Sequence, residues 1–418
     1  MKKNKIVFHV GTHKTGSTAL QKFLISNEKA LIENKYVYYP CNNGINHMDL
    51  SHDLEMWGGI KLNPDFNYIF SSEDFFSRFN QSSTPPAIVG ILNNNRELFE
   101  CFDIEIVVYL REQADYLQSV YNELIKRHGF YRPINEQIVG INYLERLEEI
   151  SSLDIASKIV VRSYEPSKFI GGSIFSDFIH SVGFERVGSF NWSGEYINNA
   201  LPLKPLTFMK HVNACSLDRQ LLIRIEQTVI SLYAKENGLD KISSASFLSA
   251  EDIKNIVMLN EGQNKAISDK YFQGESLFSI RDISDSEIDK INELDALDEV
   301  LEKLSRKHSA LLRELYRELV NIELTSEISL RSQARLISKI SSLISEPLPK
   351  DKIPLISLHS ADLNELFVAD LLREISMYFE DAGKLEVAYE LLMKAKLLRP
   401  NGVVINEKLD LIGNKLNI

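Results

Sequence analysis

A glycine-rich segment near the N-terminus, GTHKTGST at Gly11–Thr18, carries the residue types that bind a phosphate or a sulfate. Its glycines allow a tight turn that directs backbone N–H groups at one point, and a helix that begins there adds partial positive charge. Lys14 adds a full positive charge, and Thr15, Ser17 and Thr18 add hydroxyl donors. The segment therefore predicts a site for a tetrahedral oxyanion. The alternative is a structural turn whose polar residues bind nothing.

The nucleoside triphosphate P-loop, GxxxxGK[ST], is the nearest competitor for this segment. Gly11 and Gly16 have the spacing of its two glycines. The residue after Gly16 is Ser17 rather than lysine, however, and the lysine stands inside the loop at Lys14. This departure disfavours an ATPase or kinase, although a P-loop kinase-like phosphotransferase stays open as the alternative enzyme class.

A second candidate phosphate site follows the apolar run IEIVVYL at residues 104–110. Arg111 comes directly after this run, and Ser119 stands eight residues later on an expected helix. Eight residues span a little over two helical turns, so the two side chains could converge on one phosphate. The planar guanidinium of arginine pairs bidentately with phosphate oxygens. The alternative is a surface arginine and a solvated serine.

Alternating strands and helices are expected to position these groups. Four apolar or β-branched runs predict strands, at residues 5–10, 68–70, 104–110 and 158–161, and each leads directly into polar residues. Apolar residues at helical spacing follow the glycine-rich loop from Thr18 to Asn34. The pattern predicts an α/β domain with a P-loop-like, mainly parallel sheet flanked by helices. Ligands bind at the carboxyl ends of such strands.

The chain changes character from about Asp285, where leucines take up heptad-like spacing and strand-like runs end. Residues 345–354 predict a linker, and LLREISMYFEDAGKLEVAYELLMKAKLLRP resembles one tetratricopeptide unit. We therefore expect a domain at 1–284, a helical region at 285–344, and a helical, tetratricopeptide-like region at 345–418. One such unit cannot bury its own face, so it should pack on the preceding helices. This all-α part could bind a protein partner or self-associate.

Composition excludes some function classes. The formal net charge is −11, which argues against nucleic-acid binding because that needs a broad basic surface. The three cysteines are far apart and have no clustered histidines, so we expect neither disulfides nor a metal site. The apolar run Ile6–Val10 is too short for a signal sequence or a membrane span. A cytoplasmic protein without a transmembrane segment is expected.

The loop and the strand ends together resemble the sulfotransferases that use 3′-phosphoadenosine-5′-phosphosulfate (PAPS). In that family a lysine precedes a Thr/Ser-Gly-Ser/Thr-Thr turn, as Lys14 does here, and an arginine after a strand with a serine on the next helix binds the 3′-phosphate, as Arg111 and Ser119 would. A Tyr-Glu pair closes a later strand, as Tyr164-Glu165 does. The resemblance covers about Lys5 to Phe278 and is closest to bacterial enzymes that act on glycans. A glycine-rich C-terminal nucleotide segment is not evident.

This resemblance implies an activity and a division of roles. PAPS would be the co-substrate, and its sulfuryl group would go to a carbohydrate hydroxyl of a surface polysaccharide or a glycolipid. A position at the surface of the inner membrane is the alternative to a purely cytoplasmic one. Residues that contact the nucleotide would be Lys14, Thr15, Gly16, Ser17, Thr18, Arg111, Ser119, Arg162 and Tyr164, with Tyr164 stacked on the adenine.

The transfer also needs charge neutralisation and a general base. Lys14 suits the first role, and Glu73, which follows the run at 68–70, is the candidate base. An equal alternative is that Glu73 caps the helix that begins at Ser-Ser-Glu-Asp. His13 would contact the donor sulfate or the acceptor. A non-catalytic scaffold with a sulfotransferase-like domain is the third hypothesis.

Overall fold

The computed structural model divides the chain into two compact units, and each is described by itself. The first unit comprises Met1–Val120, Ile134–Asn198 and Leu248–Asp285, and the second comprises Tyr121–Pro133, Asn199–Phe247 and Ser286–Ile418. Within them the structure describes residues 3–41, 44–76, 85–137, 141–192, 201–234, 247–279, 293–322, 324, 326–344 and 365–418.

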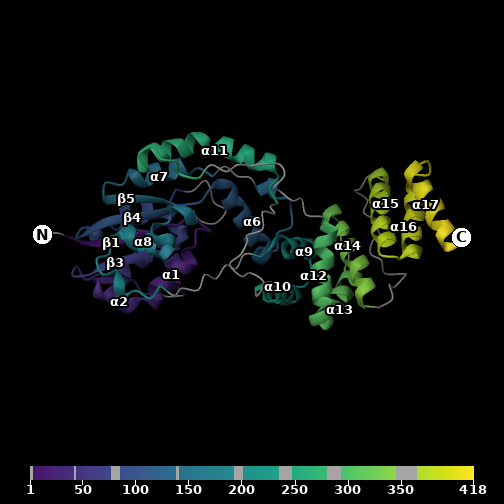
Figure 1. The fold of residues 1–418 in the computed structure, drawn as a ribbon, viewed down its shortest axis with the longest axis horizontal. Coiled ribbons are helices and arrows are strands. Elements are labelled where there is room, and N and C mark those ends of the chain that lie inside the picture. The colour runs from purple at the N-terminus through teal and green to yellow at the C-terminus, as the bar shows by residue number, and fades with distance from the viewer. Residues whose placement is uncertain are drawn as a thin grey trace. The chain divides into compact units, whose positions relative to one another are not determined.

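The first unit contains a five-stranded, all-parallel sheet (Figure 1), which confirms the predicted fold class. In spatial order its strands are β2 (Tyr36–Tyr38), β3 (Asn67–Ser71), β1 (Asn4–His9), β4 (Phe102–Leu110) and β5 (Ala156–Ser163). β4 is buried along almost its whole length, because both faces of the sheet are covered and its apolar run therefore has no solvent side.

One face of the sheet is covered by the helices that follow β1 and β5. These helices are α1 (Ser17–Ser26), α2 (Glu28–Glu33) and α8 (Ile174–Val182). Their apolar residues pack in one cluster with Val7 and Val107 of the central strands. Because side chains alternate along a strand, the neighbours of Val7 and Val107 point to the opposite face.

The opposite face is covered by segments that follow β2, β3 and β4, together with α11 from later in the chain. They are α3 (Met48–His52), the 3-10 helix η1 (Leu54–Gly59), α4 (Ala87–Asn94), α5 (Arg96–Phe99), α7 (Tyr143–Ser151) and α11 (Ala250–Tyr271). Their apolar residues share a core with Phe8, Phe70 and Ile106 of the sheet. Thus the chain leaves β1 toward one face and leaves its neighbours β3 and β4 toward the other. Such a topological switch point opens a crevice at the carboxyl end of β1, where ligands of α/β proteins bind.

The second unit is helical throughout its described part. Besides the end of α6 (Gln113–His128) it contains α9 (Leu203–Ala214), α10 (Arg219–Ala234), α12 (Glu293–Lys307), α13 (Ser309–Asn321), α14 (Glu327–Ile344), α15 (Glu365–Asp381), α16 (Leu385–Leu398) and α17 (Val403–Leu416). The predicted all-α C-terminal region is therefore confirmed for the described residues. None of the helices in the described ranges has both the length and the hydropathy needed to cross a bilayer.

The tetratricopeptide-like segment forms α15 and α16, with α17 beside them (Figure 1). Six residues of the segment have the spacing of a tetratricopeptide unit's packing positions. Five of them are buried, namely Leu372, Ile375, Phe379, Ala388 and Ala395, whereas the sixth, Pro400, is exposed. The predicted linker at 345–354 lies outside the described residues. α9 and α10, which the predicted first domain includes, group with the second unit. The predicted domain boundaries stay predictions.

Candidate functional site

The glycine-rich loop joins β1 to α1 and turns through two residues in the left-handed region. Lys14 has φ 69°, and Gly16 has φ 74° and stands at the N-cap of α1. No side chain caps this helix, and its first turn carries no acidic residue. Since the first N–H groups of an α-helix have no partner within the helix, the N-terminus of α1 presents donors and partial positive charge to the loop. This geometry suits an oxyanion.

Hydrogen bonds hold the loop against the end of β4. The Thr12 hydroxyl donates to the carbonyl oxygen of Tyr109 at 3.1 Å, and the Arg111 guanidinium donates to the carbonyl oxygen of Lys14 at 2.9 Å. The Thr15 hydroxyl donates to the carbonyl oxygen of Thr12 at 2.6 Å, so it stabilises the loop itself. Of the three hydroxyls that the sequence offered to a ligand, those of Ser17 and Thr18 are the better candidates.

Both glycines of the loop are in close contact with neighbouring side chains. A Cβ atom on Gly11 would lie 2.6 Å from the Ser17 hydroxyl oxygen. A Cβ atom on Gly16 would lie 3.0 Å from the Tyr164 hydroxyl oxygen, and its positive φ also favours glycine. Tyr164 comes from the end of β5, so the close contact brings that strand end against the loop.

Ser17 supplies the most direct indication of a ligand. The residue is 2% exposed, and its hydroxyl oxygen has no hydrogen-bond partner among the described residues. A buried polar atom without a partner is costly, so a ligand that accepts a hydrogen bond from it would stabilise the site. Because Ser17 is the first residue of α1, an oxyanion at the helix N-terminus would accept a hydrogen bond from this hydroxyl. A phosphate or sulfate therefore fits the residues present.

The segment after β3 places Glu73 beside α1. The Glu73 carboxylate accepts a hydrogen bond from the Gln21 amide at 3.4 Å, and that amide also donates to the Ser71 hydroxyl at 3.1 Å. The following 3-10 helix η2 (Glu73–Phe75) is capped by the Ser72 hydroxyl, which accepts from the backbone N–H of Asp74. The capping hydrogen bond thus belongs to Ser72, and the Glu73 side chain reaches toward the helix that begins in the loop.

A cluster of two histidines around Asp74 was not predicted. His13 Nε2 lies 3.1 Å from one carboxylate oxygen of Asp74, and His52 Nε2 lies 2.6 Å from the other. Burial raises the pKa of the Asp74 carboxyl, but the hydrogen bonds and charges of the two histidines outweigh this effect and leave the pKa below its ordinary value. The buried carboxylate thereby orients the His13 imidazole within the loop.

Arg111, which follows β4, and Tyr164, which follows β5, both lie against the loop. They do so because β1, β4 and β5 are consecutive parallel strands whose carboxyl ends lie at one edge of the sheet. The Arg111 guanidinium lies 5.7 Å from the centre of the Tyr164 ring, in a cation–π geometry, while it also bonds the loop. Ser119 is partly buried on α6, and no hydrogen bond joins it to Arg111. Arg111 and Tyr164 therefore belong to one group with the loop, whereas the role of Ser119 stays a prediction.

Arg162, which the sequence predicted as a nucleotide contact, instead pairs with a buried carboxylate. Its guanidinium forms a two-pronged ion pair with the fully buried carboxylate of Asp177 on α8. The same carboxylate accepts hydrogen bonds from the Tyr109 hydroxyl and the backbone N–H of Ile170, both at 2.8 Å. A buried carboxylate with three donors needs its arginine, so the arrangement favours a structural role for Arg162 over nucleotide binding.

Two buried histidines near the site remain neutral. Burial lowers the pKa of His9 to about 3. Burial likewise lowers the pKa of His47 to about 4, against the opposing effect of hydrogen bonds with Tyr39 and Ser71. The backbone N–H of Ser71 donates to Nδ1 of His47 at 2.9 Å, so the ring proton lies on Nε2, which donates to the Tyr39 carbonyl at 2.8 Å. His47 thereby continues the hydrogen bonding of β3 beyond the end of β2.

These two histidines predict acid lability of the first unit. Below about pH 6.5 the unfolded chain binds two protons that the folded unit excludes until about pH 4 and pH 3, so stability falls as the pH decreases through this window. Each histidine should contribute about 1.4 kcal/mol per pH unit. Urea unfolding can be followed by tryptophan fluorescence, because Trp57 and Trp192 both lie in the first unit. A His47→Gln variant should show a shallower pH dependence than the wild type; an equal slope would contradict the assignment.

Among the described residues no group of three or more His, Cys, Asp or Glu side chains is arranged to hold a metal ion. Sequence reasoning missed Gln21 and Asp74, and it did not foresee that His52 pairs with Asp74. A signal for Asp74 was available, since it stands next to Glu73 at the same strand end, but nothing local indicated its partners. No protein-family model, curated protein or solved structure matches this chain.

Proposed function

We propose that this protein is a sulfotransferase that uses PAPS as donor and a carbohydrate hydroxyl as acceptor. The observation that supports this proposal most strongly is the N-terminus of α1, which has no side-chain cap and lies beside the Ser17 hydroxyl, for which the described residues provide no hydrogen-bond partner. The loop that leads into this helix contains Lys14. A tetrahedral oxyanion satisfies this arrangement. The position of the lysine favours a phosphosulfate over a nucleoside triphosphate, because the P-loop of ATPases and kinases has its lysine after the second glycine.

The residues divide into those that would hold the donor and those that would act on the acceptor. Lys14, Ser17 and the N–H groups at the start of α1 would bind the 5′-phosphate and stabilise the charge that develops on it. Arg111 supports the loop and offers its remaining N–H groups to a phosphate, and Tyr164 offers an aromatic surface to the base. Arg162 is left out, since Asp177 holds it.

The proposed transfer is an in-line exchange at sulfur. The acceptor oxygen forms a bond to sulfur, the bond between sulfur and the 5′-phosphate oxygen breaks, and adenosine 3′,5′-bisphosphate leaves. The acceptor proton passes to a general base, for which Glu73 is the first choice. His13, oriented by Asp74, is the second choice, because a histidine with a fixed carboxylate partner is a common proton acceptor.

Ligand binding tests this proposal directly. Isothermal titration calorimetry of the purified protein should detect binding of adenosine 3′,5′-bisphosphate without added metal, because the loop's lysine and amides neutralise the phosphate. ATP with Mg²⁺ should bind at least about tenfold more weakly. Absence of bisphosphate binding by the wild type would refute the sulfotransferase, and tight Mg²⁺-dependent binding of ATP would support the phosphotransferase instead.

A further inference from the structure

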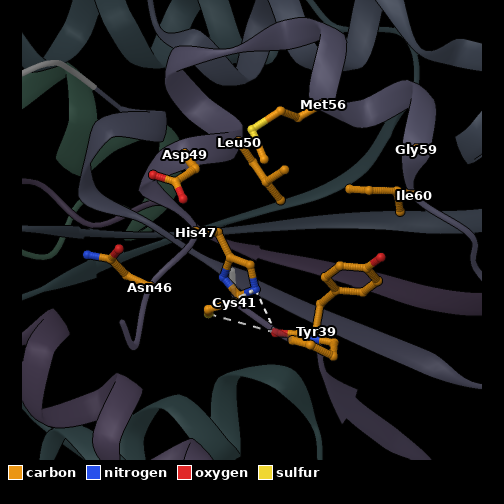
Figure 2. A pocket seen from close by; sticks show the side chains of 10 residues that line it. Tyr39, Cys41, Asn46, His47, Asp49, Leu50, Met56, Gly59 and Ile60 are labelled. Carbon is orange, nitrogen blue, oxygen red and sulfur yellow. Dashed lines mark hydrogen bonds between the residues drawn. The ribbon is translucent and has the colours of Figure 1, made fainter. Parts of the chain in front are cut away.

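A pocket of about 210 Å³ lies beside the candidate site, in the same unit. It is bounded by the chain after β2, by α3 and by η1, and Figure 2 shows its lining. The Tyr39 ring and the side chains of Met56 and Ile60 form one side, and Asn46 and Asp49 lie on the other. The pocket is thus apolar on one side and hydrogen-bonding on the other. It is smaller than the roughly 300 Å³ at which sites for drug-sized ligands begin, so it has room for a single small ring.

The lining disfavours anions. Burial lowers the pKa of His47 to about 4, so this imidazole is uncharged at neutral pH. Burial raises the pKa of the Cys41 thiol, which therefore stays protonated. Among the residues that line the pocket, Asp49 carries a charged side chain at neutral pH, and its carboxylate repels anions. The pocket therefore has the opposite electrostatic preference to the loop that contains Lys14, and it suits an uncharged ligand with hydroxyl groups.

Hydrogen bonds connect the pocket wall to the candidate base. The backbone N–H of His47 donates to the Ser71 carbonyl at 2.9 Å, and its imidazole accepts from the Ser71 N–H at 2.9 Å. The Ser71 hydroxyl in turn accepts from the Gln21 amide that reaches Glu73. The charge of Glu73 also raises the pKa of Tyr38, the last residue of β2, after the larger effects of burial and Cys41. A ligand in the pocket would thus lie next to the strand end that carries Glu73.

We propose that this pocket holds one uncharged sugar ring of the acceptor. The apolar C–H face of a pyranose would pack on Tyr39, Met56 and Ile60, and its hydroxyls would exchange hydrogen bonds with Asn46 and Asp49. The lining carries no positive charge at neutral pH, so the ring belongs to a neutral glycan residue and not to one already sulfated. This assignment rests on the proposed function.

Two glycines of η1 provide a matched pair of variants. Gly59 lines the pocket and Gly58 does not. Apart from its chain neighbours and its own helix backbone, a Cβ atom on either glycine would meet no heavy atom of the described residues within 4 Å. Neither glycine has a positive φ, so the backbone accepts a side chain at both positions. Leucine at position 59 should reduce the pocket, whereas leucine at position 58 should leave it unchanged.

Saturation-transfer NMR tests the pocket with methyl glycosides of neutral hexoses and N-acetylhexosamines, in the presence of adenosine 3′,5′-bisphosphate. At least one glycoside should bind the wild type and Gly58→Leu, and Gly59→Leu should weaken binding about tenfold. The 6-sulfated counterpart should bind more weakly than the neutral glycoside. The inference is overturned if no glycoside binds a wild type that binds the bisphosphate, if Gly59→Leu binds glycosides normally, or if sulfated glycosides bind as well. If the wild type binds neither a glycoside nor the bisphosphate, the proposed function itself is overturned.

Discussion

Replacing Lys14 with alanine is expected to lower kcat/KM for PAPS by about 10²–10³-fold, the usual cost of removing one preorganised group that stabilises transition-state charge. The loop keeps its conformation in this variant, because the Lys14 carbonyl still accepts from Arg111 and alanine adopts the positive φ no worse than lysine does. The loss should therefore come from the missing charge.

Two measurements locate the origin of that loss. Calorimetry should show weaker binding of adenosine 3′,5′-bisphosphate by about 1.5–3 kcal/mol, the range for a charged hydrogen bond. Lys22 on α1 is the matched control, since it is exposed and lies one turn beyond the loop. Lys22→Ala removes the same charge from the same helix and should change kcat/KM little. Equal losses in the two variants would mean that Lys14 acts only through the overall charge of the helix.

Glu73→Gln is expected to reduce turnover by about 10²–10⁴-fold while donor binding stays unchanged. Glutamine keeps the size of the side chain, and its carbonyl oxygen can still accept from the Gln21 amide. Only the ability to take a proton is removed. Sulfate transfer from radiolabelled PAPS to a glycan acceptor, measured together with bisphosphate binding, separates the two effects.

His13→Gln decides between the two candidate bases. If Glu73 is the base, His13→Gln should lower turnover modestly, and Glu28→Gln on α2, an exposed carboxylate, should have no effect. If Glu73→Gln keeps full activity and His13→Gln is inactive, His13 is the general base. Asp74→Asn should then share the defect of His13→Gln, because Asp74 orients that ring.

The two remaining hypotheses are separated by the same variants. A phosphotransferase would require Mg²⁺ and ATP and would not respond to PAPS. A scaffold would bind the bisphosphate, yet Glu73→Gln would be indistinguishable from the wild type in every cellular assay. In that case the second unit, with its tetratricopeptide-like helices α15 and α16, would be the place to seek a partner.

The strands and the loop were predictable because their signals are local. The runs at residues 5–10, 68–70, 104–110 and 158–161 coincide with β1, β3, β4 and β5. Buried parallel strands need continuous apolar, β-branched residues, and such runs stand out in any sequence. β2 has three residues, too few to establish a period, and it was not predicted.

The glycine-rich loop was likewise predictable from neighbouring residues, together with the helix that follows it. Tertiary structure alone decided what surrounds it. Asp74 meets His13 and His52, and Arg162 meets Asp177, across separations of up to 61 residues. His13 meets Asp74 because β1 and β3 are parallel neighbours whose carboxyl ends lie at one edge of the sheet, whereas Arg162 meets Asp177 because α8 packs back on the sheet. A residue's type limits the chemistry it can perform, but its partner determines which role it takes, and that partner is set by the fold.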